Sequence, residues 1–150
     1  MSGAEFRLLG LDNDSAGFLG LITLNDPKHN GNALDAELLR DLTEQLRNWQ
    51  NMNIRAIVMR SSSKTAFSVG MDFDSFIRCD ATEQDAASLY RVCLDSIYRF
   101  PAPVFCLLEK PARAGGVGLV MSADCVLATA EASLTLGEAL FGLIPANVMP

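Results

Sequence analysis

Residues 111–123 constrain the fold more than any other part of the sequence. They follow an apolar run typical of a buried strand, 104–108, and they carry Ala114-Gly115-Gly116-Val117-Gly118 before a small, apolar run of helical character. A strand that passes through glycines into a helix presents backbone N–H groups with no side chain in front of them, and such a position attracts negative charge. The segment therefore predicts either a phosphate site or a site for an oxyanion that develops during a reaction.

The overall composition favours a single globular domain, 1–150. Of the 150 residues 49% are hydrophobic, enough to bury a core, and no apolar run is long enough to span a bilayer. The N-terminus lacks a signal peptide and the four cysteines form no Cys-x-x-Cys pair, so we expect reduced thiols and a cytoplasmic protein. A net charge of −6 without a Lys/Arg cluster argues against nucleic acid or an anionic membrane as partner. His29 is the only histidine, and no metal site is predicted.

The pattern of apolar residues predicts an α/β chain. Two β-rich runs, 5–11 and 17–24, flank a cluster of turn formers and predict a hairpin. An amphipathic helix is predicted from the apolar residues at helical spacing, Leu34, Leu38, Leu39, Leu42, Leu46 and Trp49. A second helix is expected between a helix-start box at Thr82 and the prolines Pro101 and Pro103. Further strands are expected at 55–60, 66–70, 104–108, 125–129 and 133–136, so strands alternate with helices.

Several residues have both a structural and a functional interpretation. The glycines begin a Gly-x-Gly-x-x-Gly pattern that ends at Met121, so a dinucleotide site is disfavoured, and they equally suit helix packing. His29 is interpreted as a solvated loop residue, whereas its neighbour Lys28 is placed to meet a phosphate. Glu138 stands in an otherwise small and apolar segment, which puts its carboxylate either at the surface or in a pocket that raises its pKa.

Four segments, in order along nearly the whole chain, resemble the crotonase superfamily of enoyl-CoA hydratases and isomerases. They are 20–27 with Asn32-Ala33-Leu34, then 55–59, 66–73, and Ala114-Gly115-Gly116 with Leu119 and Asp124. The resemblance implies a crotonase-like spiral of β-β-α units that binds an acyl thioester of CoA or phosphopantetheine, with no permanently bound cofactor. Family members continue into helices that cap the pocket and build trimers. We therefore expect a core that lacks the C-terminal helical segment, and a homo-oligomer.

The resemblance also implies roles for particular residues. The backbone N–H groups of Met71 and Gly115 are expected to form an oxyanion hole for the thioester oxygen. Glu138, seven residues before Pro145, matches one of the two catalytic glutamates of the family hydratases, and Gly118 stands where the other belongs. Water addition by two glutamates is therefore disfavoured, and Glu138 is expected to move the proton alone. The residues expected to line the substrate site are Lys28, Ala66, Phe67, Val69, Gly70, Asp72 and Gly116.

A narrower resemblance suggests the substrate. Met71-Asp72-Phe73 and residues 137–146 resemble the dehydratases of polyketide β-branching cassettes, which remove water from a 3-hydroxy-3-methylglutaryl group on an acyl carrier protein. This implies a lyase whose partner is an acidic carrier protein or an acyl-CoA. A carrier protein would need a local basic patch, for which the candidates are Lys64, Arg91, Arg99 and Arg113. The alternatives are an isomerase or decarboxylase of the same family, or a module that binds thioesters or oligomerises without turnover.

Overall fold

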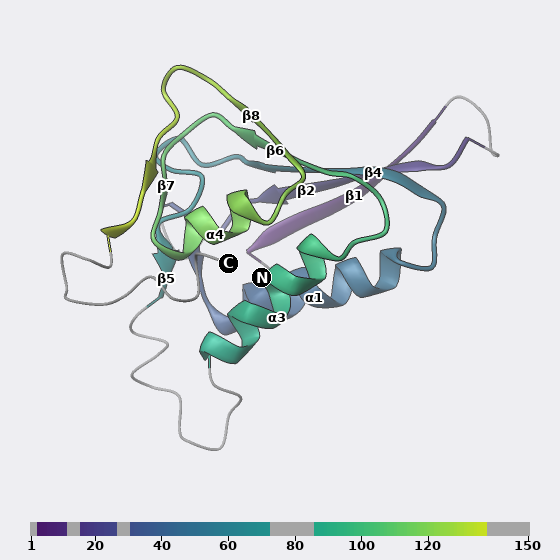
Figure 1. Ribbon diagram of the computed structural model, residues 1–150, viewed down its shortest axis with the longest axis horizontal. Helices are drawn as coiled ribbons and strands as arrows, with labels where there is room; N and C mark the ends of the chain where they lie inside the picture. Colours follow the sequence, from purple (N-terminus) through teal and green to yellow (C-terminus); the bar gives the residue numbers. More distant parts are fainter. Residues whose placement is uncertain (1–2, 12–15, 27–30, 73–85, 138–150) are drawn as a thin grey trace.

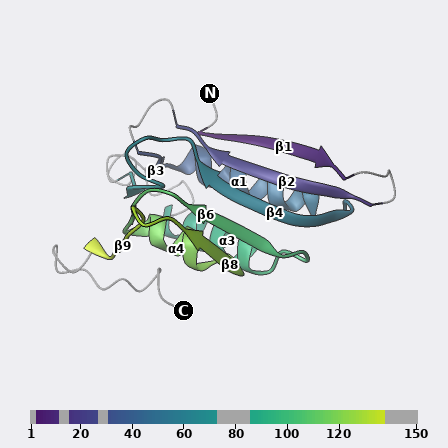
Figure 2. The same ribbon diagram turned by 90° about the horizontal axis from the view of Figure 1, so that it is seen from above.

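A five-stranded sheet forms the centre of the molecule. The computed structural model describes residues 3–11, 16–26, 31–72 and 86–137. The strands of the sheet follow the order β1-β2-β4-β6-β8, with β1 antiparallel to β2 and the other neighbours parallel. The helices lie against one face of this sheet (Figures 1 and 2). The strand bounds are β1 Ala4–Gly10, β2 Phe18–Leu24, β4 Ile54–Ser61, β6 Val104–Leu108 and β8 Cys125–Ala128.

The chain repeats one unit, in which a long strand is followed by a two-residue strand and then by a helix. The first unit is β2, β3 (Ala33–Leu34) and α1 (Ala36–Trp49). The second is β4, β5 (Gly70–Met71) and α3 (Ala86–Tyr98), and the third is β6, β7 (Ala112–Arg113) and α4 (Gly115–Met121). A fourth unit begins with β8 and β9 (Leu134–Thr135). The predicted spiral of β-β-α units is therefore confirmed.

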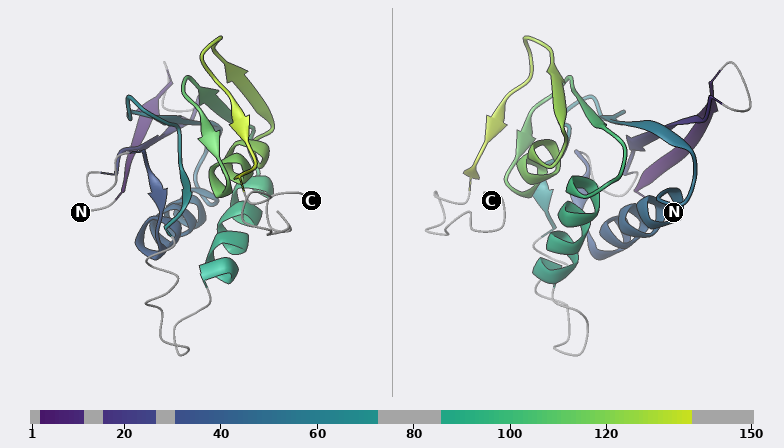
Figure 3. Two further views of the ribbon diagram at one scale, coloured as in Figure 1. Left: turned by 90° about the vertical axis from the view of Figure 1, so that its left-hand side faces the viewer. Right: turned by 45° about the vertical axis from the view of Figure 1, so that its right-hand side comes forward.

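The short strands form a second layer beside the main sheet. β3 pairs with β5 and β7 pairs with β9, both in parallel. A parallel bridge between Ser68 and Ala112 joins the two pairs. Figure 3 shows the green and yellow segments of β7 and β9 running side by side. Loops from successive turns of the spiral are thereby brought to one place.

The core lies between the sheet and the helices. Asp35 caps α1, with its carboxylate accepting a hydrogen bond from the Leu38 N–H at 2.8 Å, and the apolar face of α1 is buried as predicted. Each fully buried leucine stabilises the fold by roughly 1.5–3 kcal/mol. α3 contributes a similar face, and the core residues of the two helices are Leu38, Leu39, Leu42, Leu46, Trp49, Leu89, Tyr90, Cys93 and Ile97.

The structure differs from the sequence prediction in a few places. Leu34 was expected on the first helix, but it lies in β3, because Asp35 caps α1 and the helix begins at Ala36. β7 was not predicted, since its two residues are extended only through their partners in β9 and the Ser68 loop. The helix-start box at Thr82 lies outside the described residues. Among the described residues, no helix is long and apolar enough to cross a membrane.

Candidate functional site

Two loops from successive turns of the spiral lie side by side. The Phe67 N–H donates to the carbonyl of Pro111 at 2.8 Å, and the Arg113 N–H donates to the carbonyl of Ser68 at 3.0 Å. With the Ser68–Ala112 bridge, these bonds fix the loop that ends at Met71 against the loop that ends at Gly115. The two segments that the sequence analysis assigned to the oxyanion hole are therefore neighbours.

Gly70 permits the closest approach between the loops. Its φ is +95°, a conformation that glycine adopts and other residues avoid. A Cβ at this position would lie 2.9 Å from the Ala114 Cβ and 3.0 Å from the Gly115 nitrogen. Glycine is thus required at position 70 both by the backbone conformation and by the space available.

The amides of Met71 and Gly115 lie close together. A Cβ built on Gly115 would be 3.5 Å from the Met71 nitrogen. The Asp72 N–H donates to the Leu34 carbonyl at 3.1 Å, and because N–H groups alternate along a strand, the Met71 N–H points away from Leu34. Gly115 is the first residue of α4, so its N–H has no acceptor within the helix. The two amides for which the sequence analysis expects an oxyanion hole are therefore neighbours in the structure.

Ala114, directly before this amide, has an unusual backbone conformation. Its φ is 46° and its ψ is −125°, which for a residue with a Cβ costs about 1–3 kcal/mol. Its N–H donates to the Thr135 carbonyl at 2.8 Å, so β9 helps to hold the turn in place. Backbone strain of this kind is common where a structure fixes functional groups.

The side chains of the first loop mostly face the interior. Ala66 and Phe67 are fully buried, so only their backbone is placed to meet a ligand. Val69 is half-buried, with its N–H donating to the Gly31 carbonyl at 2.9 Å, and Asp72 is half-buried at the end of β5. A Cβ on Gly116 would lie 2.8 Å from both the Cβ and the carbonyl oxygen of Ser68, so Gly116 allows α4 to contact the first loop. The predicted site residues Lys28 and Glu138 lie outside the described residues.

Asn32 connects the first loop to the rest of the domain, a role that the sequence analysis missed. Its side chain is buried, its Nδ2 donates to the Phe67 carbonyl at 2.9 Å and to Ser61 Oγ at 2.8 Å, and its Oδ1 accepts from the Asp26 N–H. Its own carbonyl accepts from Ser68 Oγ at 2.7 Å. Its φ is 54°, a conformation that asparagine tolerates better than most residues. The residue type was therefore the signal in the sequence that could have indicated a special backbone position.

β9 leads the chain toward the two amides. It runs parallel to β7, with Arg113 opposite Thr135. Gly115 follows the end of β7 by two residues, and Gly137 follows the end of β9 by two residues. Because the strands are parallel, the chain leaves both of them at the same end of the pair. Gly137 is the last described residue before Glu138.

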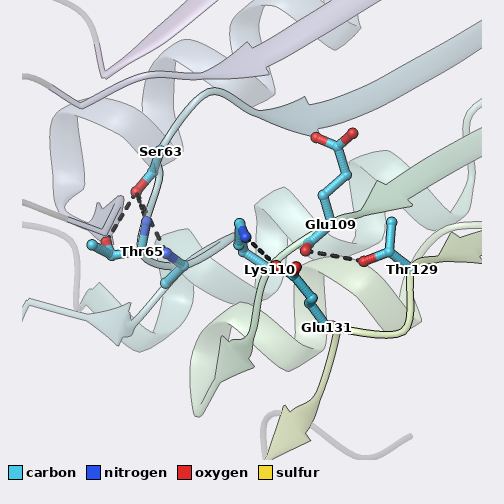
Figure 4. A network of polar contacts seen from close by, with 7 residues as sticks. Ser63, Thr65, Glu109, Lys110, Thr129 and Glu131 are labelled. Carbon is cyan, nitrogen blue, oxygen red and sulfur yellow. Dashed lines mark hydrogen bonds and ion pairs between the residues drawn. The ribbon is translucent and has the colours of Figure 1, made fainter.

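A polar network at the surface ties the connection after β6 to the connection after β8 (Figure 4). Lys110 forms an ion pair with Glu131, and Thr129 Oγ1 donates to the Glu109 carbonyl at 3.1 Å. The hydrogen bond from Lys110 holds the pKa of the exposed Glu131 carboxyl below its usual value. These contacts support the β7–β9 pair from outside.

Other possible sites in the described part of the chain are less suitable. It contains no group of three or more His, Cys, Asp or Glu side chains that could hold a metal. A groove of about 510 Å³ lies between α1 and α3, where Arg40 and Arg47 flank Glu44. Its charges are of both signs, and none of its lining residues belongs to the two loops.

Comparisons with known proteins agree with the fold. The sequence profile of the enoyl-CoA hydratase/isomerase family matches residues 15–149. A Bacillus subtilis protein assigned as enoyl-CoA hydratase/isomerase YngF is 32% identical over 129 residues, which are 85% of this chain and 49% of that protein. Carnitinyl-CoA dehydratase of Escherichia coli K12 is 28% identical over 125 residues, which are 83% of this chain and 47% of the enzyme.

The same family appears among solved structures. A Legionella pneumophila protein assigned to the enoyl-CoA hydratase/isomerases (crotonases) superimposes with a TM-score of 0.82 at 28% identity, covering 100% of this chain and 56% of the other. The chain spans about half the length of the curated relatives it matches. Profile, relatives and fold agree, and the chain belongs to the enoyl-CoA hydratase/isomerase (crotonase) family.

Proposed function

We propose that this chain carries the thioester-activating half of an acyl-thioester lyase. One observation carries the proposal: the backbones of Met71 and Gly115 lie close together where two turns of a crotonase spiral meet. A thioester oxygen between them would accept both hydrogen bonds, which strengthen as the oxygen becomes an enolate. Each such donor is worth roughly 3–4 kcal/mol of activation free energy.

Glu138 is the proposed proton carrier in the dehydration. Its carboxylate takes a proton from C2 of a 3-hydroxyacyl thioester, and the electron pair moves onto the thioester oxygen. As the carbonyl forms again, the C2=C3 double bond forms and the C3–O bond breaks. The departing hydroxide receives the proton from Glu138 and leaves as water. A single carboxylate suffices for both transfers, which suits a chain with Gly118 at the family's other glutamate position.

The proposed acyl group is 3-hydroxy-3-methylglutaryl on an acyl carrier protein, with an acyl-CoA as the alternative carrier. The support is the resemblance of residues 71–73 and 137–146 to β-branching dehydratases. Lys64, Arg91 and Arg113 are exposed and suit an acidic carrier protein, whereas Arg99 is paired with Asp95 at 2.5 Å.

The decisive experiment follows the mass of the carrier-bound acyl group. We expect loss of one water from a 3-hydroxy-3-methylglutaryl carrier protein, and loss of most turnover in Glu138→Gln with thioester binding retained. Glu44→Gln, an exposed glutamate on α1 away from the two loops, is the matched control and should keep full activity. Full activity in Glu138→Gln would show that another group carries the proton. Loss of carbon dioxide, or a shifted double bond, would indicate a decarboxylase or an isomerase.

A second candidate, a thioester-binding or oligomerising module, is favoured by one surface. Large apolar side chains on and around the β8 edge are exposed, namely Met121, Val126, Leu127, Leu134 and Leu136. Such a patch suits contact with another copy of the chain. Light scattering after size exclusion should then show a homo-oligomer. A monomer at all concentrations would contradict the oligomerising module, whereas thioester binding without turnover would favour the binding module.

A further inference from the structure

Tyr90 contacts the backbone of the candidate site from behind. It lies on α3 with only 3% of its surface exposed, and its hydroxyl donates to the Gly115 carbonyl at 2.6 Å. The sequence analysis assigned this tyrosine no role of its own. A buried phenol that reaches a backbone carbonyl on another helix instead connects α3 to a particular atom of α4.

The same hydroxyl also fills the space beside Gly118. A Cβ at position 118 would lie 2.0 Å from the Tyr90 oxygen, 3.1 Å from its Cζ and 3.2 Å from Leu94 Cδ1. No side chain fits there while the tyrosine is present. Gly118 and Tyr90 therefore depend on one another. The tyrosine occupies the space that a side chain at position 118, such as the family's other glutamate, would need.

We propose that Tyr90 is a positioning residue for the Gly115 amide; the proposal rests on the function proposed above. Gly115 packs against Met71, and its carbonyl accepts the hydrogen bond of Tyr90. Holding the carbonyl limits rotation of this glycine, which has no side chain of its own to hold it, and so fixes the direction of its N–H. A misplacement of about 1 Å at a reacting group can cost roughly 100-fold in rate.

The test removes only the hydroxyl, by Tyr90→Phe. We expect kcat for dehydration of the 3-hydroxyacyl thioester to fall about tenfold while KM stays within twofold, because the loss falls on the developing enolate more than on the bound ground state. Tyr98→Phe is the matched control, since Tyr98 is on the same helix but 74% exposed, and it should match the wild type. Equal kcat in Tyr90→Phe and wild type would overturn the proposal.

A spectroscopic measurement separates this proposal from the function on which it rests. Infrared difference spectra of bound crotonyl-CoA carrying ¹³C at the thioester carbonyl report how strongly the amides polarise that carbonyl. We expect a shift to lower frequency in the wild type and a smaller shift in Tyr90→Phe. No shift in the wild type would overturn the proposed function, and with it the role of Tyr90. An equal shift in wild type and Tyr90→Phe would overturn the role of Tyr90 alone.

A thermal-unfolding cycle tests the contact without substrate. Gly118→Ala should lower the Tm of the wild type more than it lowers the Tm of Tyr90→Phe, because removal of the oxygen leaves Cζ at 3.1 Å as the nearest tyrosine atom. The same measurements show whether Tyr90→Phe is folded. Equal decreases in both backgrounds would show that the hydroxyl does not occupy the space beside Gly118.

Discussion

At the scale of single residues, the candidate site depends on positions whose side chains face away from any ligand. Asn32 holds the Phe67 carbonyl, Gly70 allows the loops to approach, and Ala114 is strained directly before the Gly115 amide. The chemistry is assigned to backbone N–H groups, so these residues act by fixing the course of the backbone. Substitutions at such positions should therefore affect stability and turnover together.

Replacement of Gly70 by alanine tests the close approach. Strain at a φ of +95° costs about 1–3 kcal/mol, and the added Cβ would also press on Ala114 at 2.9 Å. Gly70→Ala should therefore lower the free energy of unfolding in urea and abolish most turnover. Gly10→Ala is the matched control, because a Cβ at Gly10 would contact nothing within 4 Å. Similar effects of the two substitutions would contradict this account.

Replacement of Asn32 by alanine tests the connection to the first loop. It removes the hydrogen bond to the buried Phe67 carbonyl and the one from the Asp26 N–H, and loss of a partner at a buried polar group costs about 1–3 kcal/mol. We expect Asn32→Ala to lower the free energy of unfolding by at least 2 kcal/mol, roughly the lower end of what two such groups would cost. Asn48→Ala, at an exposed position on α1, should change it little. Wild-type stability in Asn32→Ala would show that the loop is held by other contacts.

At the scale of elements, a helix or strand could be predicted from the sequence only when it was long enough to show its own hydrophobic periodicity. α1 and the long strands carry their own hydrophobic periodicity, so β6 and the hairpin of β1 and β2 were predicted within a residue or two. The two-residue strands β3 and β7 carry no such signal, because their extended conformation is set by partners far away in sequence. The expectation for Met71 and Gly115 came from the family resemblance of their segments. The contact of Tyr90 joins two helices, so the sequence could not distinguish Tyr90 from a core residue until α3 and α4 were placed together.

The start of α1 offers a prediction about a single helix. Asp35 satisfies the Leu38 N–H, and loss of an N-cap costs about 1 kcal/mol. Asp35→Ala should lower the free energy of unfolding by that amount, measured in urea, whereas Asp35→Asn should retain most of the stability because asparagine also caps well. An equal loss in both variants would show that the charge of Asp35 matters rather than its hydrogen bond.

At the scale of the whole molecule, two buried thiols make stability depend on alkaline pH. Burial raises the pKa of Cys93 and of Cys106 from 9.0 to about 12. A raised pKa means that folding disfavours the thiolate, so this contribution is fully present below pH 9 and is lost as the pH rises from 9 toward 12. Denaturation midpoints should therefore fall across this window in a Cys79→Ser background.

The exposed Cys125 provides the comparison for that prediction. At neutral pH it should react quickly with a disulfide reagent, whereas Cys93 and Cys106 should react only on unfolding. Cys125→Ser should leave the alkaline decline in stability unchanged. Fast labelling of three thiols in the folded Cys79→Ser protein would contradict the burial of the two core cysteines.

The bridge between Ser68 and Ala112 has a consequence for how this domain can be recombined with relatives. Each of two adjoining spiral turns supplies one of the two amides, and the bridge fixes the position of one turn's loop relative to the other's. A chimera whose crossover falls between β5 and β7 would take its two donors from different parents, and their alignment would depend on loops that never evolved together. The smallest exchangeable unit of this site is therefore a pair of turns, from β4 through α4, rather than one β-β-α repeat.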